Sequence, residues 1–262
     1  MDWDGGEAVE QRREADVFEI PTLLAKLDDQ ATDVQHEGVR TVRQHVDDHP
    51  GLCLPTVPKL RALLGASAID CHDEIAYCLA ELAAESPADV APSTDEIVSF
   101  VGENPAAAAT SHLFRCLALV AGEQPGALHD HVDVLTDAID ERAEYGTWER
   151  RILDVLSRET PAELVPAVPV LVDALVADPD ARATVAATIG RIGAVTDAPA
   201  DPTRERLRTL LEDEKADVRA NACLALGNAG VIDARDRLDE LAAEDPDPTV
   251  RERAAQASDR LS

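Results

Sequence analysis

The chain has 262 residues, of which 45% are apolar and 3% aromatic, and a formal net charge of −28 from 52 Asp and Glu against 24 Lys and Arg. This charge argues against general nucleic-acid binding, which depends on neutralising phosphates, although it leaves room for one local basic groove. Binding to anionic membrane surfaces is disfavoured for the same reason. No apolar run reaches the roughly 18 residues that a spanning helix needs, so we expect a protein without membrane association.

A helix-opening motif recurs along the chain at nearly constant intervals. It is first seen at residues 33–35 and again 37 residues later at 70–72, and a second pair with the same spacing lies at 180–182 and 217–219. Apolar residues with helical periodicity follow each motif. The gap between the two pairs is close to three intervals of 37, which predicts two further helices near residues 108 and 145. A last helix follows near Val250, after a shorter interval.

These helices predict a repeated unit of an outer helix, a turn and an inner helix. Residues 1–16 are expected to form an N-terminal tail or cap, and residues 17–262 a single repeat domain. We interpret the segment 196–202 as a long loop between repeats, and a linker between two domains is the alternative. A capping residue followed by proline marks several expected helix starts: Asn104–Pro105, Thr160–Pro161, Asp178–Pro179, Asp201–Pro202 and Asp245–Pro246. The approximate units are 17–48, 50–86, 90–124, 126–160, 161–195, 202–230 and 231–262.

The sequence DVRANACLALG at residues 217–227 resembles HEAT repeats, in particular the short class also found in phycobilin lyases. The resemblance covers the chain from about residue 17, is strong in the last three repeats, and is weak at 90–160, where the Val-Arg signature is missing. It implies an all-α fold, an α-solenoid (superhelix) of about seven HEAT-type helical hairpins. It also implies that three arginines form an Asp–Arg ladder that ties one repeat to the next, namely Arg182, Arg219 and Arg251 beside Asp180, Asp217 and Asp247.

The balance of charged residues also resembles that of a particular group of proteins. High acidity with only three lysines, Lys26, Lys59 and Lys215, is similar to the proteins of salt-loving archaea. A GC-rich genome, which favours Ala, Arg and Asp, would give a similar composition. A halophilic protein would need salt to fold, because unscreened carboxylates oppose the compact state. The acidic first residues are not a secretory signal, so a cytoplasmic location is expected.

Metal and catalytic motifs are sparse. The five cysteines, Cys53, Cys71, Cys78, Cys116 and Cys223, are odd in number and scattered, which favours reduced, buried thiols. Three pairs have usable metal-ligand spacing but lack further ligands nearby, so no metal and no cofactor are expected. There is no Gly-rich phosphate loop, no Gly-x-Ser-x-Gly and no His-Glu-x-x-His, so an enzyme is not predicted. The three pairs are His45 with His49, His129 with His131, and Cys71 with His72.

One repeat position carries large side chains in the first four units. It is occupied by Arg40, Tyr77, Phe114 and Arg151, each 37 residues from the next, and Trp148 lies one helical turn before Arg151. Aromatic residues and Arg dominate binding hot spots. We therefore predict that these five residues form a peptide- or protein-binding stripe on the concave face. The alternative is that they fill gaps between neighbouring inner helices.

The sequence favours a non-catalytic scaffold or adaptor for protein–protein interaction, because repeat stacks offer an extended concave surface to partners. No small-molecule substrate is evident. A first alternative, a bilin-lyase-like protein or other HEAT-type enzyme accessory subunit, is suggested only by the resemblance. A second is DNA binding in the style of HEAT-like alkylpurine glycosylases. That alternative needs a basic groove, whereas Asp73, Glu74 and Glu81 fall on the same expected side as the arginines.

Overall fold

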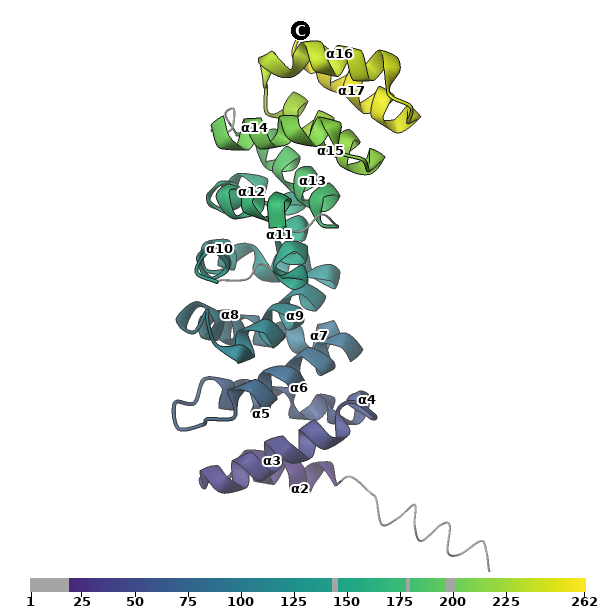
Figure 1. The fold of residues 1–262 in the computed structure, drawn as a ribbon. Coiled ribbons are helices and arrows are strands. Elements are labelled where there is room, and N and C mark those ends of the chain that lie inside the picture. Colours follow the sequence, from purple (N-terminus) through teal and green to yellow (C-terminus); the bar gives the residue numbers. More distant parts are fainter. Residues whose placement is uncertain (1–18, 143–145, 178–179, 197–200) are drawn as a thin grey trace, which may run out of the picture.

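The computed structural model describes residues 19–142, 146–177, 180–196 and 201–262, and in these ranges it contains helices and turns without a strand. The helices stack in two columns, with α2 at one end of the molecule and α17 at the other (Figure 1). The predicted α-solenoid of seven helical hairpins is therefore confirmed. The tail or cap predicted for residues 1–16 lies outside the described residues, as do residues 197–200 of the predicted loop.

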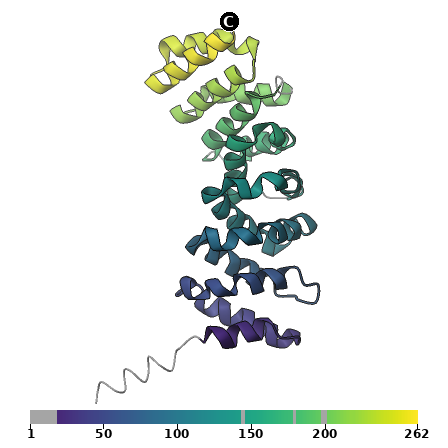
Figure 2. The same cartoon turned by 180° about the vertical axis from the view of Figure 1, so that it is seen from behind.

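Each hairpin contributes its first helix to one column and its second helix to the other, and both columns can be followed in the view from behind (Figure 2). We call them the first-helix column and the second-helix column. The first-helix column consists of α2 (Ile20–Leu27), α4–η1–α5 (Pro50–Cys53, Leu54–Thr56, Val57–Leu64), α7–η2–α8 (Pro87–Val90, Ala91–Ser93, Thr94–Glu103), η3–α10 (Pro125–His131, Val132–Asp140), η4–α12 (Pro161–Ala167, Val168–Ala177), α14–η5 (Asp201–Thr209, Leu210–Glu212) and η6–α16 (Ile232–Ala234, Arg235–Glu244). The second-helix column consists of α3 (Thr32–His45), α6 (His72–Glu85), α9 (Ala108–Glu123), α11 (Thr147–Glu159), α13 (Arg182–Gly193), α15 (Ala216–Asn228) and α17 (Pro248–Arg260).

Prolines divide the first helices into a short segment and a longer helix. Pro55 and Pro58 stand in the first turns of η1 and α5, and Pro92 stands in the first turn of η2. Proline lacks an N–H and clashes with the preceding turn, so a regular α-helix cannot continue through these positions. The 3₁₀ segments absorb the change of direction between the two parts.

The predicted capping pairs have mixed outcomes. Two of them mark helix starts, because η4 begins at Pro161 and α14 begins at Asp201. Asn104 ends α8, and Thr160 precedes η4 without a side-chain cap bond. The carboxylate of Asp245 is engaged by Arg219 instead of capping a helix. The cap of α17 is Asp247, which precedes Pro248. Its carboxylate accepts from the amides of Thr249 and Val250. Asp178 and Pro179 lie outside the described residues.

Two of the three ladder arginines, Arg182 and Arg219, reach across repeats, but they bind other carboxylates than expected. Arg182 donates to Asp213 at 2.9 Å, in the turn of the next hairpin, and Arg219 donates to both oxygens of Asp245 at 2.8 and 2.9 Å. Arg251 instead donates to the backbone carbonyl of Asp245 at 2.6 Å. The aspartates adjacent to these arginines have separate roles, since Asp180 binds Lys215, Asp217 accepts from the amide of Val218, and Asp247 caps α17.

The last three second helices approach one another through small residues. A Cβ placed on Gly190 would lie 3.0 Å from the Cα of Ala225, and one on Gly227 only 2.6 Å from the Cα of Ala257. Amide side chains bond across the same interface, because Asn221 and Asn228 of α15 donate to backbone carbonyls of α13 at 2.9 and 3.0 Å. One hydrophobic cluster extends along the stack from Leu23 to Ala257. That residues 17–262 form a single repeat domain stays a prediction.

Replacing Gly227 with Ala is expected to destabilise the protein, because the new methyl group would meet the backbone of α17 at 2.6 Å. We expect a loss of about 1–3 kcal/mol, the usual cost of overpacking, despite the better helix propensity of Ala. Urea denaturation followed by circular dichroism measures it. The control is Gly126→Ala, since a Cβ there meets no atom within 4 Å. Equal midpoints for the two variants would contradict the close approach of α15 and α17.

Candidate functional site

The exposed face of the second-helix column carries a polar cluster where α3, α6 and α9 meet. Tyr77 of α6 is half-buried, and its hydroxyl donates to the carboxylate of Asp47 at 2.8 Å. The guanidinium carbon of Arg43 lies 3.6 Å from the centre of the Tyr77 ring, and Arg43 also donates to Asp47 at 2.8 Å. On the other side, the His112 ring meets Tyr77 edge-on with 5.3 Å between ring centroids. One aromatic side chain thus connects three successive repeats.

The charges of this cluster compensate one another. The hydrogen bond from Tyr77, followed by that from Arg43, holds the pKa of the Asp47 carboxyl below its ordinary value. The same hydrogen bond, which Tyr77 donates to Asp47, raises the pKa of the Tyr77 phenol above its ordinary value. Glu81, one turn after Tyr77, forms a short hydrogen-bonded ion pair with Arg115 of α9. The Tyr77 region therefore holds helices together and presents little uncompensated charge to a partner.

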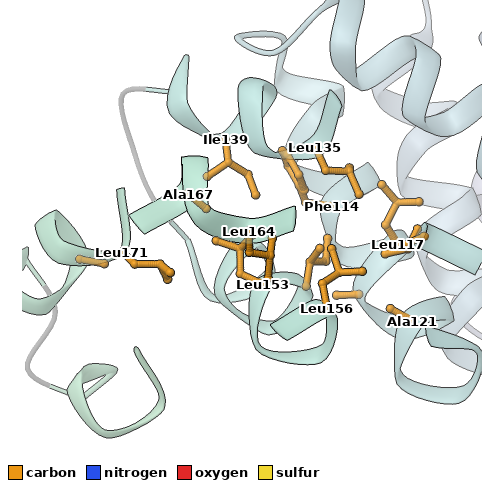
Figure 3. Close-up of a cluster of buried hydrophobic side chains, with 14 of the residues drawn as sticks. Phe114, Leu117, Ala121, Leu135, Ile139, Leu153, Leu156, Leu164, Ala167 and Leu171 are labelled. Atoms are coloured by element: carbon orange, nitrogen blue, oxygen red, sulfur yellow. The ribbon is translucent and has the colours of Figure 1, made fainter. Parts of the chain in front are cut away.

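Phe114 does not belong to an exposed stripe. Its side chain is fully buried, in the same hydrophobic cluster as Leu117, Leu135 and Leu153 (Figure 3). The cause is the register between α6 and α9. Within the buried stretch of α6, Tyr77 and Glu81 are half-buried, and the corresponding half-buried positions of α9 are Arg115 and Leu119, each 38 residues later. An offset of 37 falls one residue short, and each residue rotates a helical side chain by about 100°. The sequence prediction that Phe114 faces the groove is wrong for this reason.

The other predicted residues keep some exposure. Arg40 is exposed on α3 and lines a cavity of about 270 Å³ together with His36 and Cys71. Trp148 is half-buried near the start of α11, and Arg151 is exposed one turn later. The structure therefore separates the predicted stripe into Arg40 on α3, the Tyr77 cluster, and Trp148 with Arg151 on α11.

Trp148 and Arg151 belong to a second group of side chains, which we call the arginine patch. Trp148, Arg151, Val155 and Arg158 recur at helical spacing on one face of α11, with Trp148 and Val155 half-buried and the two arginines exposed. The guanidinium of Arg151 lies over Gly122 of α9, with its Nη2 3.2 Å from the place that a Cβ would occupy. The patch consists of Trp148, Arg151, Val155 and Arg158 of α11, and of Arg191 of α13, which shares Asp154 with Arg158.

Asp154 is the carboxylate that organises one side of the patch. It accepts from Arg158 at 2.8 Å and also from Arg191, so two guanidinium groups share one carboxylate. Arg191 also donates to the hydroxyl of Ser157 at 2.8 Å. Asp154 is 16% exposed whereas Arg158 is 62% exposed. The guanidinium of Arg158 therefore faces solvent, whereas Arg191 is only 30% exposed and the carboxylate lies beneath Arg158.

Sequence reasoning missed Arg43, Asp47, His112, Asp154 and Arg191. Their common signal is a spacing of 30–37 residues to a side chain of opposite or aromatic character in the adjacent second helix. A search for compensating pairs at these spacings, instead of identical positions at 37, could have found them.

The described residues show how the cysteines and the possible metal ligands are placed. Within them, no group of three or more His, Cys, Asp or Glu side chains is placed to hold a metal ion. Burial raises the pKa of the Cys53 thiol to about 11 and those of Cys78, Cys116 and Cys223 to about 12. These thiols are protonated at neutral pH and are poor nucleophiles. All five cysteines have free thiols.

A separate cavity of about 580 Å³ lies between the turn after α5 and the last turns of α8. Its aromatic lining is Phe100, whose ring centroid is 5.1 Å from that of His72. Asp73, Glu96 and Glu103 supply carboxylates at its rim. The carboxylate of Glu96 is already paired with Arg61 at 3.5 Å.

The fold and the exposed helical face define the class of protein as a helical-repeat solenoid. Residues 167–258 match the family of HEAT repeats. This match covers the last three hairpins, so the resemblance to HEAT-repeat proteins is confirmed where the sequence signature is strongest. No curated protein matches the chain. No helix among the described residues has the length and apolarity to cross a membrane.

Three solved structures illustrate the similarity of fold. An engineered protein matches 78% of this chain and 96% of its own, with 21% identity and a TM-score of 0.59. A mutant of Kap121p matches 92% of this chain and 29% of its own, with 13% identity and a TM-score of 0.45. A designed armadillo repeat protein matches 93% of this chain and 100% of its own, with 15% identity and a TM-score of 0.43. The first of these supports the solenoid fold.

Proposed function

We propose that the protein is a non-catalytic scaffold that binds a protein or peptide partner on the exposed face of its second-helix column. The observation that carries the proposal is the arginine patch. It combines a half-buried tryptophan with an exposed arginine that lies over the neighbouring helix. Tryptophan and arginine are enriched among the residues that contribute most to binding, and a helical stack holds them on a rigid surface.

The remaining residues of the predicted stripe have lesser roles in this proposal. Arg40 lies at the edge of the face, on α3. Tyr77 holds α6 against α3 and α9. Phe114 supports α9 from within and does not touch the partner. The binding surface proposed here is thus centred on α9, α11 and α13.

The test is affinity capture from a lysate of the source organism, with the full chain as bait. We expect a partner that is retained by the wild-type protein and reduced about tenfold or more by Trp148→Ala with Arg151→Ala. The control is Arg206→Ala, which removes an exposed arginine on α14. A partner captured equally by the double variant would show that another surface binds it. Circular dichroism confirms that both variants are folded.

A further inference from the structure

The sign of charge in the arginine patch is opposite to that of the chain as a whole. The patch presents the guanidinium groups of Arg151, Arg158 and Arg191 against the single carboxylate of Asp154. The whole chain has 52 acidic against 24 Lys and Arg residues. Arg158 and Arg191 share the carboxylate of Asp154, and the exposed Arg151 lies one helical turn before Asp154 on α11. In a protein of this composition, such a group of arginines is an exception that needs a physical reason.

Internal stability does not account for all three arginines. Arg191 has a structural role, because it joins α13 to Asp154 and Ser157 of α11. Arg158 is 62% exposed and pairs with a carboxylate that Arg191 already neutralises, and exposed pairs contribute little to stability. Arg151 lies over Gly122, where any larger residue would displace it.

We propose that the arginine patch binds a short acidic segment of a partner protein, with carboxylates on Arg151 and Arg158 and an apolar side chain against Trp148 and Val155. This proposal rests on the proposed function, since it names the chemistry of the partner at the same surface. Arg151 and Arg158 are separated by seven residues of one helix, which is about 10 Å. Two carboxylates two helical turns apart in the partner match this spacing. Arginine is also suited to carboxylates, because its planar guanidinium can donate two parallel bonds.

The surroundings of the patch favour a short segment over an extended polyanion. Toward the N-terminus, α6 exposes Asp73, Glu74 and Glu85 on its surface. Toward the C-terminus, α15 carries Asn221 and Asn228, which are uncharged. Glu123 and Glu159 stand at the ends of α9 and α11. A nucleic acid that crossed several repeats would meet the carboxylates of α6 as well, whereas a segment confined to α9, α11 and α13 would meet only Glu123 and Glu159 among these five.

Fluorescence anisotropy with labelled synthetic peptides tests the proposal on the full chain. The probe is a 15-residue helical peptide of Glu, Leu and Ala with its Glu and Leu residues on one face, and matched peptides carry Gln or Lys in place of Glu. We expect the Glu peptide to bind at least about tenfold more tightly than the others, and binding to weaken as salt is raised. Equal binding of the Glu and Lys peptides, no binding of any peptide, or tighter binding of a 15-nucleotide single-stranded DNA would overturn the proposal.

Two charge reversals locate the binding surface. Arg151→Glu is expected to raise the Kd of the Glu peptide by about tenfold or more, whereas Arg206→Glu, an equal change of charge on α14, is expected to leave it within about twofold. Equal effects of the two variants would indicate general electrostatics and refute the site. If lysate capture depends on Trp148 and Arg151 but the Glu peptide shows no preference, the scaffold stands and the acidic chemistry is wrong. If capture is unaffected by those substitutions, the scaffold surface itself is refuted.

Discussion

Replacing Asp245 with Asn is expected to lower the free energy of unfolding by about 3–5 kcal/mol at pH 7, because it leaves a charge without its partner in a buried ion pair. Asp245 is 3% exposed and accepts from Arg219, which is 12% exposed. The carboxylate also accepts from the amide of Asp247 at 2.9 Å. The substitution thus weakens the joint between the sixth and seventh hairpins. Urea denaturation and hydrogen exchange in α16 and α17 measure the loss.

The effect of this substitution should depend on pH in a definite direction. The hydrogen bonds from Arg219 lower the pKa of the Asp245 carboxyl below its ordinary value, which is about 3.9 in an unfolded chain. The ionised carboxylate therefore stabilises the fold fully above that pH, and its contribution is lost as the pH falls through the folded-state pKa. We expect the difference between wild type and Asp245→Asn to shrink at pH values below about 4. A difference that stays constant down to pH 2 would contradict an ionic role.

A matched ion pair on the surface provides the control. Arg237 binds Glu212 at 2.7 Å, but the two side chains are 40% and 63% exposed. Exposed pairs contribute roughly 0–1 kcal/mol, because water screens them and two long side chains lose freedom. Arg237→Ala should therefore cost far less than Asp245→Asn. Similar costs would mean that burial does not distinguish the two pairs.

The fold could be predicted from the sequence because its main signal is periodic. A spacing of 37 residues recurs between several helix starts, and variants of the Asp-Val-Arg text at residue 217 mark some of the second helices. Stacking of such hairpins follows from their need to bury one apolar face. The family match over residues 167–258 lies where this text is best preserved.

The partners of individual side chains could not be read from the same period. The carboxylates that bind Arg182 and Arg219 are Asp213 and Asp245, which stand in turns and not beside the arginines. Turn geometry decides which of several nearby aspartates a guanidinium reaches. In a chain with 52 acidic residues, sequence alone offers too many choices.

The predicted stripe failed in part because it relied on an identical offset in every repeat. The second helices differ in length, from 12 residues in α13 to 16 in α9. Side chains of neighbouring second helices contact each other at sequence separations of 34 to 38 residues. A change of one residue in register turns a side chain by about 100°, which is enough to move it from solvent to core. Arg151 and Phe114 therefore share a sequence position without sharing a surface.

Replacing Phe114 with Ala is expected to destabilise the protein by about 3–5 kcal/mol, because it removes a fully buried ring and leaves a cavity. The ring lies in the hydrophobic cluster with Leu117 and Leu135, and the guanidinium carbon of Arg142 is 5.4 Å from its centre. Thermal and urea denaturation measure the loss. Tyr77→Phe is the comparison, since it removes only the hydroxyl bond to Asp47 and should cost no more than about 1.5 kcal/mol.

Phe114→Leu separates packing from binding at the same position. Leucine retains most of the buried apolar volume, so this variant should remain folded with a much smaller loss of stability than Phe114→Ala. If Phe114 acts only by packing, Phe114→Leu should capture the partner of the wild-type protein to the same extent, while Arg151→Ala should not. A folded Phe114→Leu protein that loses the partner would place Phe114 at the binding surface after all. Such a result would require α9 to turn its buried face outward on binding, and hydrogen exchange in α9 with and without the partner would detect that rotation.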